Sequence, residues 1–145
     1  TAQLNEDLFK KSKHLTLSIL GASSRNQIQD IVQKSFTENF GVNNCKLAFY
    51  SNSEIGAIED ITGMSFHKGA VYCGSFSKEK MEYLFKDEKV ESVALAVLVD
   101  NKEIGILMLG SYERTRYLGD EDTTFIEYIR DILEKKLELI DSLDA

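Results

Sequence analysis

The sequence has no proline, no tryptophan and only two cysteines among its 145 residues. It also lacks a low-complexity tract, and its 43% hydrophobic and 28% charged residues are typical of a globular chain, which argues against disorder. Two cysteines are too few for the disulfide framework of a small secreted domain and favour a reducing compartment. We therefore expect a single domain over residues 1–145 and a cytoplasmic location.

Long apolar runs and an excess of positive charge are both missing. The longest apolar stretches, residues 93–99 and 104–109, have the length of strands and are too short to span a bilayer. The formal net charge of -7 repels phosphate, and the basic residues are interleaved with acidic ones. We therefore expect no membrane insertion and no nucleic-acid binding.

Histidine is scarce as well. His14 and His67 are far apart in the sequence and have no companion histidine or cysteine at the spacing of metal ligands. The sequence therefore predicts neither a metal site nor haem ligation. We expect no cofactor, although binding of an unknown small effector stays open.

Apolar residues at helical spacing predict amphipathic helices at both ends of the chain. The first helix covers residues 1–20 and ends near Gly21, and because the chain starts at Thr1 we expect it to continue from an upstream segment. A second helix over residues 24–39 is favoured by a capping box, with Ser24 followed three residues later by Gln27. The last helix opens at Gly119 and Asp120 and carries an apolar stripe formed by Phe125, Ile129, Ile132, Leu133, Leu137 and Ile140.

Strands and a loop-rich region are predicted between these helices. Strands apolar on both faces are covered on both sides, and the polar turn between the two longest makes them an antiparallel hairpin. The predicted elements are a strand at 45–50, a loop-rich stretch at 51–68 with one strand or short helix near 57–61, a strand at 70–73, a short helix at 77–85 capped by Ser77, and the hairpin of 93–99 with 104–109.

Four segments carry a resemblance to a known family: ILGASSRNQIQDIVQ (19–33), AVYCG (70–74), ESVALAVL (91–98) and IGILMLGSYERTRYLGDEDTTFIEYI (104–129). Together with the element order they resemble GAF domains and, more closely, a bacterial family of unknown function numbered 484, regarded as a divergent GAF branch. The resemblance implies an α/β fold of the α+β kind. A central antiparallel sheet would carry the N- and C-terminal amphipathic helices on one face and loops plus a short helix on the other.

The resemblance fixes no activity, because the GAF class includes cyclic-nucleotide, tetrapyrrole, haem, amino-acid and purely dimerising variants. In GAF proteins a ligand is sought where loops and a short helix fold over the sheet, and aromatic and methionine side chains gather in that part of this sequence. They either line a small apolar cavity with a few polar groups or simply fill the core. The candidates are Phe49, Met64, Phe66, Tyr72, Phe76, Met81, Phe85 and Ser92.

The first and last helices present more apolar surface than one sheet face needs. In GAF proteins such helices often pair across a two-fold axis; the alternative is that the same residues only cover the sheet of their own chain. The candidates for a homodimer interface are Leu4, Leu8, Ile126, Leu133, Leu137 and Ile140. The leading expectation is a non-enzymatic sensory or regulatory module that binds a small ligand, dimerises, or does both.

An enzyme is the alternative. A small thiol-dependent enzyme of the GAF type, similar to a methionine sulfoxide reductase, would use Cys73 as its nucleophile together with a resolving cysteine. Nothing in the sequence shows that Cys45 reaches Cys73, and a buried, inert thiol is the simpler interpretation.

Overall fold

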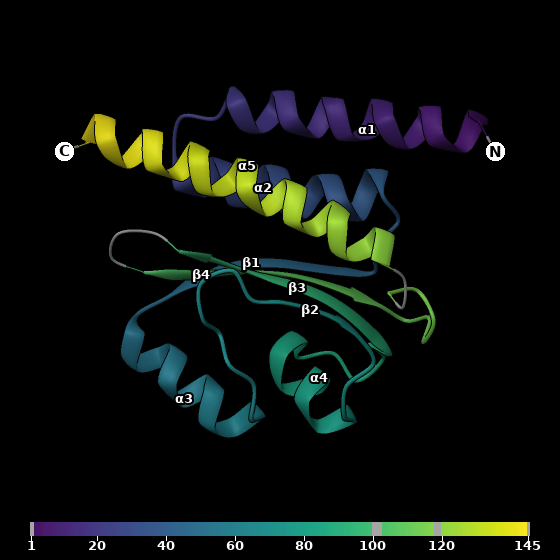
Figure 1. The fold of residues 1–145 in the computed structure, drawn as a ribbon, viewed down its shortest axis with the longest axis vertical. Coiled ribbons are helices and arrows are strands. Elements are labelled where there is room, and N and C mark those ends of the chain that lie inside the picture. The colour runs from purple at the N-terminus through teal and green to yellow at the C-terminus, as the bar shows by residue number, and fades with distance from the viewer. Residues whose placement is uncertain (1, 100–102, 118–119, 145) are drawn as a thin grey trace.

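The computed structural model describes residues 2–99, 103–117 and 120–144. Within these ranges the chain forms a mixed α/β fold in which helices lie on both faces of an open, four-stranded antiparallel sheet (Figure 1). The elements are α1 (Ala2–Leu20), α2 (Arg25–Asn39), β1 (Asn44–Tyr50), α3 (Asn52–Thr62), β2 (Val71–Gly74), α4 (Lys78–Phe85), β3 (Ser92–Val99), β4 (Ile104–Ser111) and α5 (Asp120–Asp144).

The sheet has the strand order β1-β4-β3-β2, and each strand is antiparallel to its neighbours. The predicted hairpin is confirmed, since β3 pairs with β4 with Leu98 opposite Gly105. The turn predicted between these strands lies mostly at residues 100–102, outside the described residues, as does Gly119 before α5.

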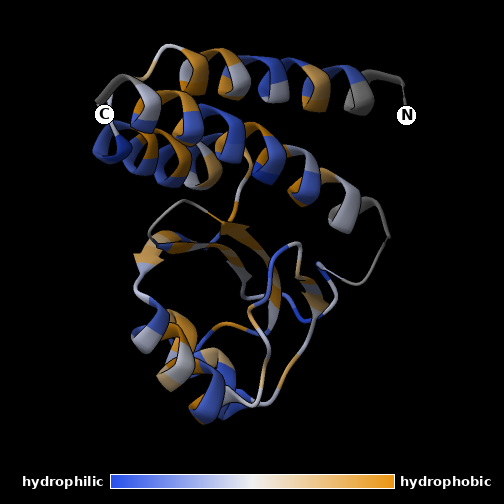
Figure 2. Cartoon of the chain, turned by 60° about the vertical axis from the view of Figure 1, so that its left-hand side comes forward, coloured by the Kyte–Doolittle hydropathy of each residue, from blue (hydrophilic) through white to orange (hydrophobic). Residues whose placement is uncertain are grey.

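Helices form two layers on one face of the sheet and one layer on the other. The helix α2 packs on β1 and α5 packs on β3 and β2, while α1 lies across α2 and α5 as an outer layer (Figure 1). The shorter helices α3 and α4 lie on the opposite face, and Figure 2 shows both groups separated by the sheet. The predicted α+β class with helices flanking an antiparallel sheet is confirmed, but the second face carries the two helices α3 and α4 where loops and one short helix were expected.

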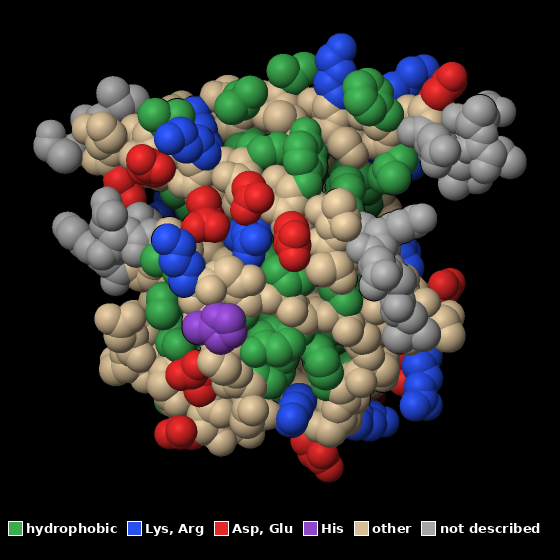
Figure 3. All heavy atoms as spheres, in the orientation of Figure 1, with side chains coloured by type: hydrophobic (Ala, Val, Ile, Leu, Met, Phe, Trp, Pro, Cys, Tyr) green, Lys and Arg blue, Asp and Glu red, His purple; other side chains and the backbone are tan. Residues whose placement is uncertain are grey.

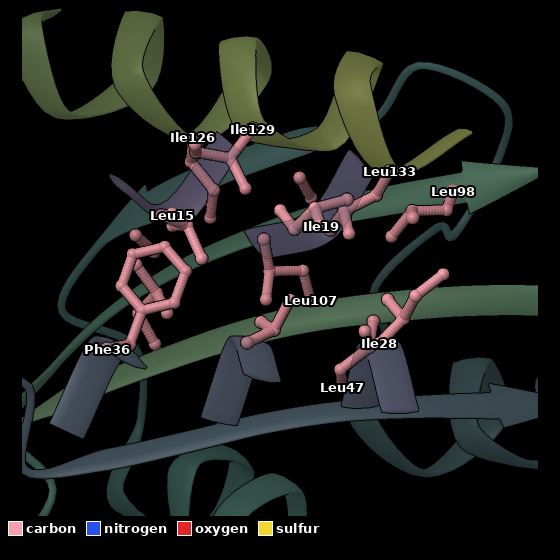
Figure 4. Packing of buried hydrophobic residues seen from close by; sticks show 14 of the residues in the cluster. Leu15, Ile19, Ile28, Phe36, Leu47, Leu98, Leu107, Ile126, Ile129 and Leu133 are labelled. Carbon is pink, nitrogen blue, oxygen red and sulfur yellow. The ribbon is translucent and has the colours of Figure 1, made fainter. Parts of the chain in front are cut away.

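Alternation along the central strands produces two separate cores. From β3, Ala94, Ala96 and Leu98 face α2 and α5. We call the cluster on that side the terminal-helix core; its other large members include Leu15, Ile19, Ile28, Phe36, Leu47, Leu107, Ile126, Ile129 and Leu133, which converge in Figure 4. On the other side is the α3–α4 core, which contains Ile55, Ile58, Met64, Phe66, Met81, Leu84, Phe85, Val93, Leu95, Val97, Ile106 and Met108.

The start of α2 agrees with the predicted capping signal in one half only. The Ser24 hydroxyl accepts a hydrogen bond from the Gln27 backbone N–H at 3.2 Å, as expected for an N-cap. The side chain of Gln27, however, accepts from the backbone N–H of Ser23 at 2.7 Å. The reciprocal hydrogen bond of the capping box is therefore made to Ser23, the residue before the N-cap. The helix still starts where the sequence predicted it.

The helix α3 is the main difference between the predicted and the observed elements. Residues 51–68 were expected to be loop-rich with a short element near 57–61, but an 11-residue helix runs over Asn52–Thr62. A complete capping box starts it, because the Ser51 hydroxyl accepts from the Glu54 N–H at 3.3 Å and the Glu54 carboxylate accepts from the Ser51 N–H at 3.0 Å.

The end of α3 is equally well marked. Gly63 has a φ of 69° and donates its N–H to the Glu59 carbonyl, which is the left-handed termination that favours glycine. Ile55, Ile58 and Thr62 share the buried side of the helix. Only three buried positions in 11 residues gave a periodic signal too weak for the sequence to predict a full helix.

Truncating a side chain where α5 meets the sheet is expected to destabilise the fold strongly. Ile126 is fully buried, so Ile126→Ala should lower the free energy of unfolding by about 2–5 kcal/mol, and Ile126→Val by about 0.5–1.5 kcal/mol. Leu139 on the same helix is half exposed, so Leu139→Ala is the matched control and should change stability by less than about 0.5 kcal/mol. Urea unfolding followed by circular dichroism measures all three, and an Ile126→Ala chain as stable as the control would contradict this packing.

Candidate functional site

Half of the candidate ligand residues are packed inside the α3–α4 core. Met64, Phe66, Met81 and Phe85 are buried there against apolar side chains of β3 and β4. Close packing of this kind supplies stability, and these four side chains have the role of core residues.

Tyr72 and Phe76 lie at the border of the same core. Their rings meet edge to face, with centroids 6.4 Å apart, and the Tyr72 hydroxyl donates to the Ser65 carbonyl at 2.6 Å. The Tyr72 hydroxyl thus holds the segment between α3 and β2.

The other two candidates belong to the opposite face of the sheet. Phe49 packs against the terminal-helix core, with the Arg25 guanidinium carbon 4.6 Å from its ring centroid. Ser92 is buried and donates to the Glu113 carbonyl at 2.6 Å. The sheet therefore divides the eight candidates between two sides, and they do not form one site.

A surface pocket opens at a different place, where β1, α3 and α4 meet. We call it the β1–α3–α4 pocket; it has a volume of about 190 Å³ and is lined by Lys46, Tyr50, Ile58, Tyr83, Leu84 and Lys86. Ile58 and Leu84 are buried, whereas the two tyrosines are half-buried and Lys86 is exposed. The pocket thus combines an apolar floor with aromatic walls and two ammonium groups.

The surroundings of Tyr50 in this pocket favour the neutral form of its phenol. Burial raises the pKa of Tyr50 above its ordinary value, and the nearby Tyr83 and Glu54 raise it further. Tyr50 therefore stays a neutral hydrogen-bond donor near neutral pH. Lys86 places its ammonium nitrogen 5.5 Å from the Tyr83 ring centroid, within cation–π range.

The sequence did not bring the lining residues together, because Lys46, Tyr83 and Lys86 look like parts of a solvated surface. Lys46 and Tyr50 alternate along β1 with Cys45, Leu47 and Phe49, which face the other core. Had this alternation been followed, it would have placed Lys46 and Tyr50 together on the α3–α4 side. Nothing in the sequence signalled that Lys86 ends α4 in the left-handed region, with a φ of 58°.

Most of the candidate dimer residues are buried within their own chain. Ile126, Leu133, Leu137 and Ile140 all belong to the terminal-helix core, and Figure 4 shows the first two pointing toward the sheet. Leu8 is 47% exposed on α1. Leu4 also lies in α1, but its side chain falls outside the described part of the structure.

Comparison with known proteins gives a family and no activity. The model of a family described as "Protein of unknown function, DUF484" matches residues 1–141. The chain belongs to DUF484. A search of the curated proteins finds no match.

The two cysteines of this DUF484 chain lie at opposite edges of the sheet. Cys45 of β1 is opposite Leu109, and Cys73 of β2 is opposite Ala94, which itself pairs with Leu109. Three interstrand spacings therefore separate them, or about 14 Å, whereas a disulfide needs Cα atoms within about 7 Å. Both are thiols packed partly against the terminal-helix core, and burial raises the pKa of Cys45 far above its ordinary value.

Acidic and basic side chains are interspersed on the surface over α5, as Figure 3 shows. Beneath it the buried Arg130 bonds through Nε to Asp131 at 2.9 Å and to Glu134 at 3.5 Å.

In the described ranges, no three histidine, cysteine or acidic side chains gather closely enough to hold a metal ion. Nor does any helix there have the length and hydrophobicity needed to cross a membrane.

The sheet geometry predicts that the native chain cannot form an internal disulfide. Mild oxidation of the folded protein should leave Cys45 and Cys73 unlinked, whereas the same treatment in urea should link them because the unfolded chain brings them together. Mass spectrometry after alkylation distinguishes the two outcomes. A Cys45–Cys73 bond formed without unfolding would contradict the strand order.

Proposed function

We propose that this DUF484 chain is a non-enzymatic, GAF-like regulatory module that binds a small effector in the β1–α3–α4 pocket and self-associates through α1. The observation that carries the proposal is the pocket itself, in which cationic and aromatic side chains surround an apolar floor. Concave sites with mainly apolar walls and a few polar groups are typical of small-molecule binding.

The arrangement of layers supports the GAF-like part of the proposal. The terminal helices lie on one face of an antiparallel sheet, and α3 and α4 lie on the other, which is consistent with the loops and short helix that the resemblance implied there (Figure 1). The effector and the layer of terminal helices would then lie on opposite faces of the sheet, with β1 between them. This arrangement is suitable for a module that reports ligand binding to other segments.

The composition of the pocket favours binding over catalysis. Among the described residues its lining has no cysteine, serine, histidine or carboxylate, so the thiol of a thiol-dependent enzyme and the usual nucleophile–base pairs of hydrolases are missing from it. Cys73 lies on the opposite side of the sheet, packed against the terminal-helix core.

The surface of α1 favours association with a second copy of the chain. Leu8 and Phe9 are adjacent in α1 and are 47% and 71% exposed. The acidic Glu6 and Asp7 precede this pair in the sequence, and the basic Lys10, Lys11 and Lys13 follow it. In an antiparallel pair of α1 helices with a two-fold axis near Phe9, the acidic end of each copy lies along the basic segment of its partner. The apolar pair would be covered at the centre of this interface.

A thermal-shift screen with neutral and charged metabolites tests effector binding. A bound compound should raise the melting temperature in proportion to the logarithm of its concentration, because it binds only the folded chain. Stabilisation should be lost in Tyr83→Ala, which removes a pocket wall, and kept in Tyr128→Ala, which alters an exposed tyrosine on α5. If no compound stabilises the protein, the effector-binding half of the proposal fails.

Sedimentation velocity over a range of concentrations tests self-association separately. The wild-type chain should sediment as a dimer, and the double variant Leu8→Glu, Phe9→Glu should sediment as a monomer because it places four carboxylates at the two-fold axis. Leu139→Glu, which adds a charge at an exposed leucine of α5, is the control and should remain dimeric. A wild-type protein that is monomeric at every concentration would refute this half of the proposal.

A further inference from the structure

The β1–α3–α4 pocket has a size that restricts its ligand. Its volume of about 190 Å³ lies below the range of about 300–1,000 Å³ for sites that enclose drug-sized molecules. Nucleotides and tetrapyrroles are therefore too large to be enclosed in it. A single ring or a short branched chain has the right dimensions.

The walls divide the pocket into an apolar part and a polar part. Ile58 from α3 and Leu84 from α4 are buried side chains that form its apolar surface. The rings of Tyr50 and Tyr83 add aromatic surface, and aromatic side chains favour stacked or edge-to-face contact with a ligand ring. These four residues match the body of a small hydrophobic molecule.

The polar part of the pocket is positively charged although the whole chain is acidic. Lys46 and Lys86 approach it from β1 and from the end of α4, and within the described ranges neither ammonium group forms an ion pair with a carboxylate. Glu54 is an acidic residue that raises the pKa of Tyr50, and its carboxylate accepts a hydrogen bond from the backbone N–H of Ser51 in the α3 capping box. The two lysines are thus available for an anion.

We propose that the β1–α3–α4 pocket binds a small carboxylate with an apolar body, such as a monocyclic aromatic acid. In this arrangement Lys46 and Lys86 hold the carboxylate, the Tyr50 hydroxyl can donate to it, and Ile58, Leu84 and the Tyr83 ring enclose the apolar body. The inference rests on the proposed effector-binding function and specifies its ligand class.

Sodium benzoate is the probe, with benzamide as its neutral counterpart and sodium acetate as the carboxylate without a ring. Two-dimensional amide NMR of the whole 15N-labelled chain should show benzoate shifting the resonances of Lys46, Tyr50, Tyr83 and Lys86. Both benzamide and acetate should bind at least fivefold more weakly, because each lacks one of the two interactions that the pocket offers.

Lysine substitutions show whether the two ammonium groups are responsible. Lys46→Met and Lys86→Met keep most of the side-chain length, and each should weaken benzoate binding roughly five- to fiftyfold through loss of a charge-assisted hydrogen bond. Lys89→Met is the matched control, because Lys89 also lies over a tyrosine ring, with its nitrogen 6.0 Å from the Tyr112 centroid, but does not line the pocket. Binding by this variant should equal that of the wild type. The amide spectrum of each variant verifies its fold.

The outcomes separate the ligand class from the proposed function. Equal binding of benzamide and benzoate at the pocket would overturn the anion inference and leave effector binding intact. Equal binding of acetate and benzoate would overturn the requirement for an apolar body. Benzoate binding that survives in the Lys46→Met, Lys86→Met double variant, or benzoate shifts confined to other residues, would overturn the inference as well. If benzoate fails and a different compound in the thermal-shift screen shifts the pocket resonances, the function stands and the inference fails.

Discussion

Strands β3 and β4 are apolar on both faces, and the remaining elements have to remove both faces from water. From β3, Val93, Leu95 and Val97 point to one side, and Ala94, Ala96 and Leu98 point to the other. Burial of apolar surface is the dominant favourable term in folding, so neither side can be left open to solvent. The helices α2 and α5 cover one side, and α3 and α4 with the segments beside them cover the other. The outer helix α1 then buries Leu15 and Ile19 against α2 and α5, which gives three helices on one side of the sheet and two on the other.

Small residues on the central strands determine how closely these layers approach. The side chains of Ala94 and Ala96 leave room for α5, whose Ile126, Ile129 and Leu133 are fully buried above the sheet. Two glycines of β4 make space for aromatic rings on opposite faces. A Cβ atom at Gly105 would lie 3.0 Å from the Phe49 ring, and one at Gly110 would lie 3.0 Å from the Phe85 ring. Both distances are shorter than normal van der Waals contact, so a larger residue at either position would displace a ring that helps to close a core.

The sequence predicted the elements whose periodicity is strong and missed the features that depend on a few polar contacts. The apolar positions of α2 and α5 repeat over several turns, and the alternation of β3 and β4 is unbroken, so these elements were placed correctly. The helix α3 was underestimated because its Ser51–Glu54 capping box stands before a weakly periodic segment. The pocket could not be predicted from composition, since Lys46 and Tyr50 come from β1 whereas Tyr83 and Lys86 come from α4 and its end. These two distant parts of the chain meet only in the folded structure, where the backbone turns at Lys86. The aromatic middle of the sequence suggested a cavity, but alternation sends Phe49 and Ser92 to the opposite side from Phe66 and Phe85.

Strand β1 connects the pocket with the helix layer through its backbone. Leu47 follows Lys46 in β1, and both of its main-chain polar groups form hydrogen bonds with side chains of α2. Its N–H donates to the Gln33 side chain at 3.1 Å, and its carbonyl accepts from the Gln29 side chain at 2.8 Å. These bonds also protect the exposed edge of the sheet, which would otherwise offer unpaired groups to another strand. A ligand bound as proposed would contact β1, the strand to which α2 is hydrogen-bonded. A ligand shifts a conformational equilibrium only by the difference between its affinities for the two conformations. Such a ligand can therefore act on α2 only if α2 packs on β1 in two arrangements and the protein binds the ligand more tightly in one of them. The hydrogen bonds of Gln29 and Gln33 to Leu47 hold α2 in place along the strand. A change between the two arrangements would therefore have to break these bonds.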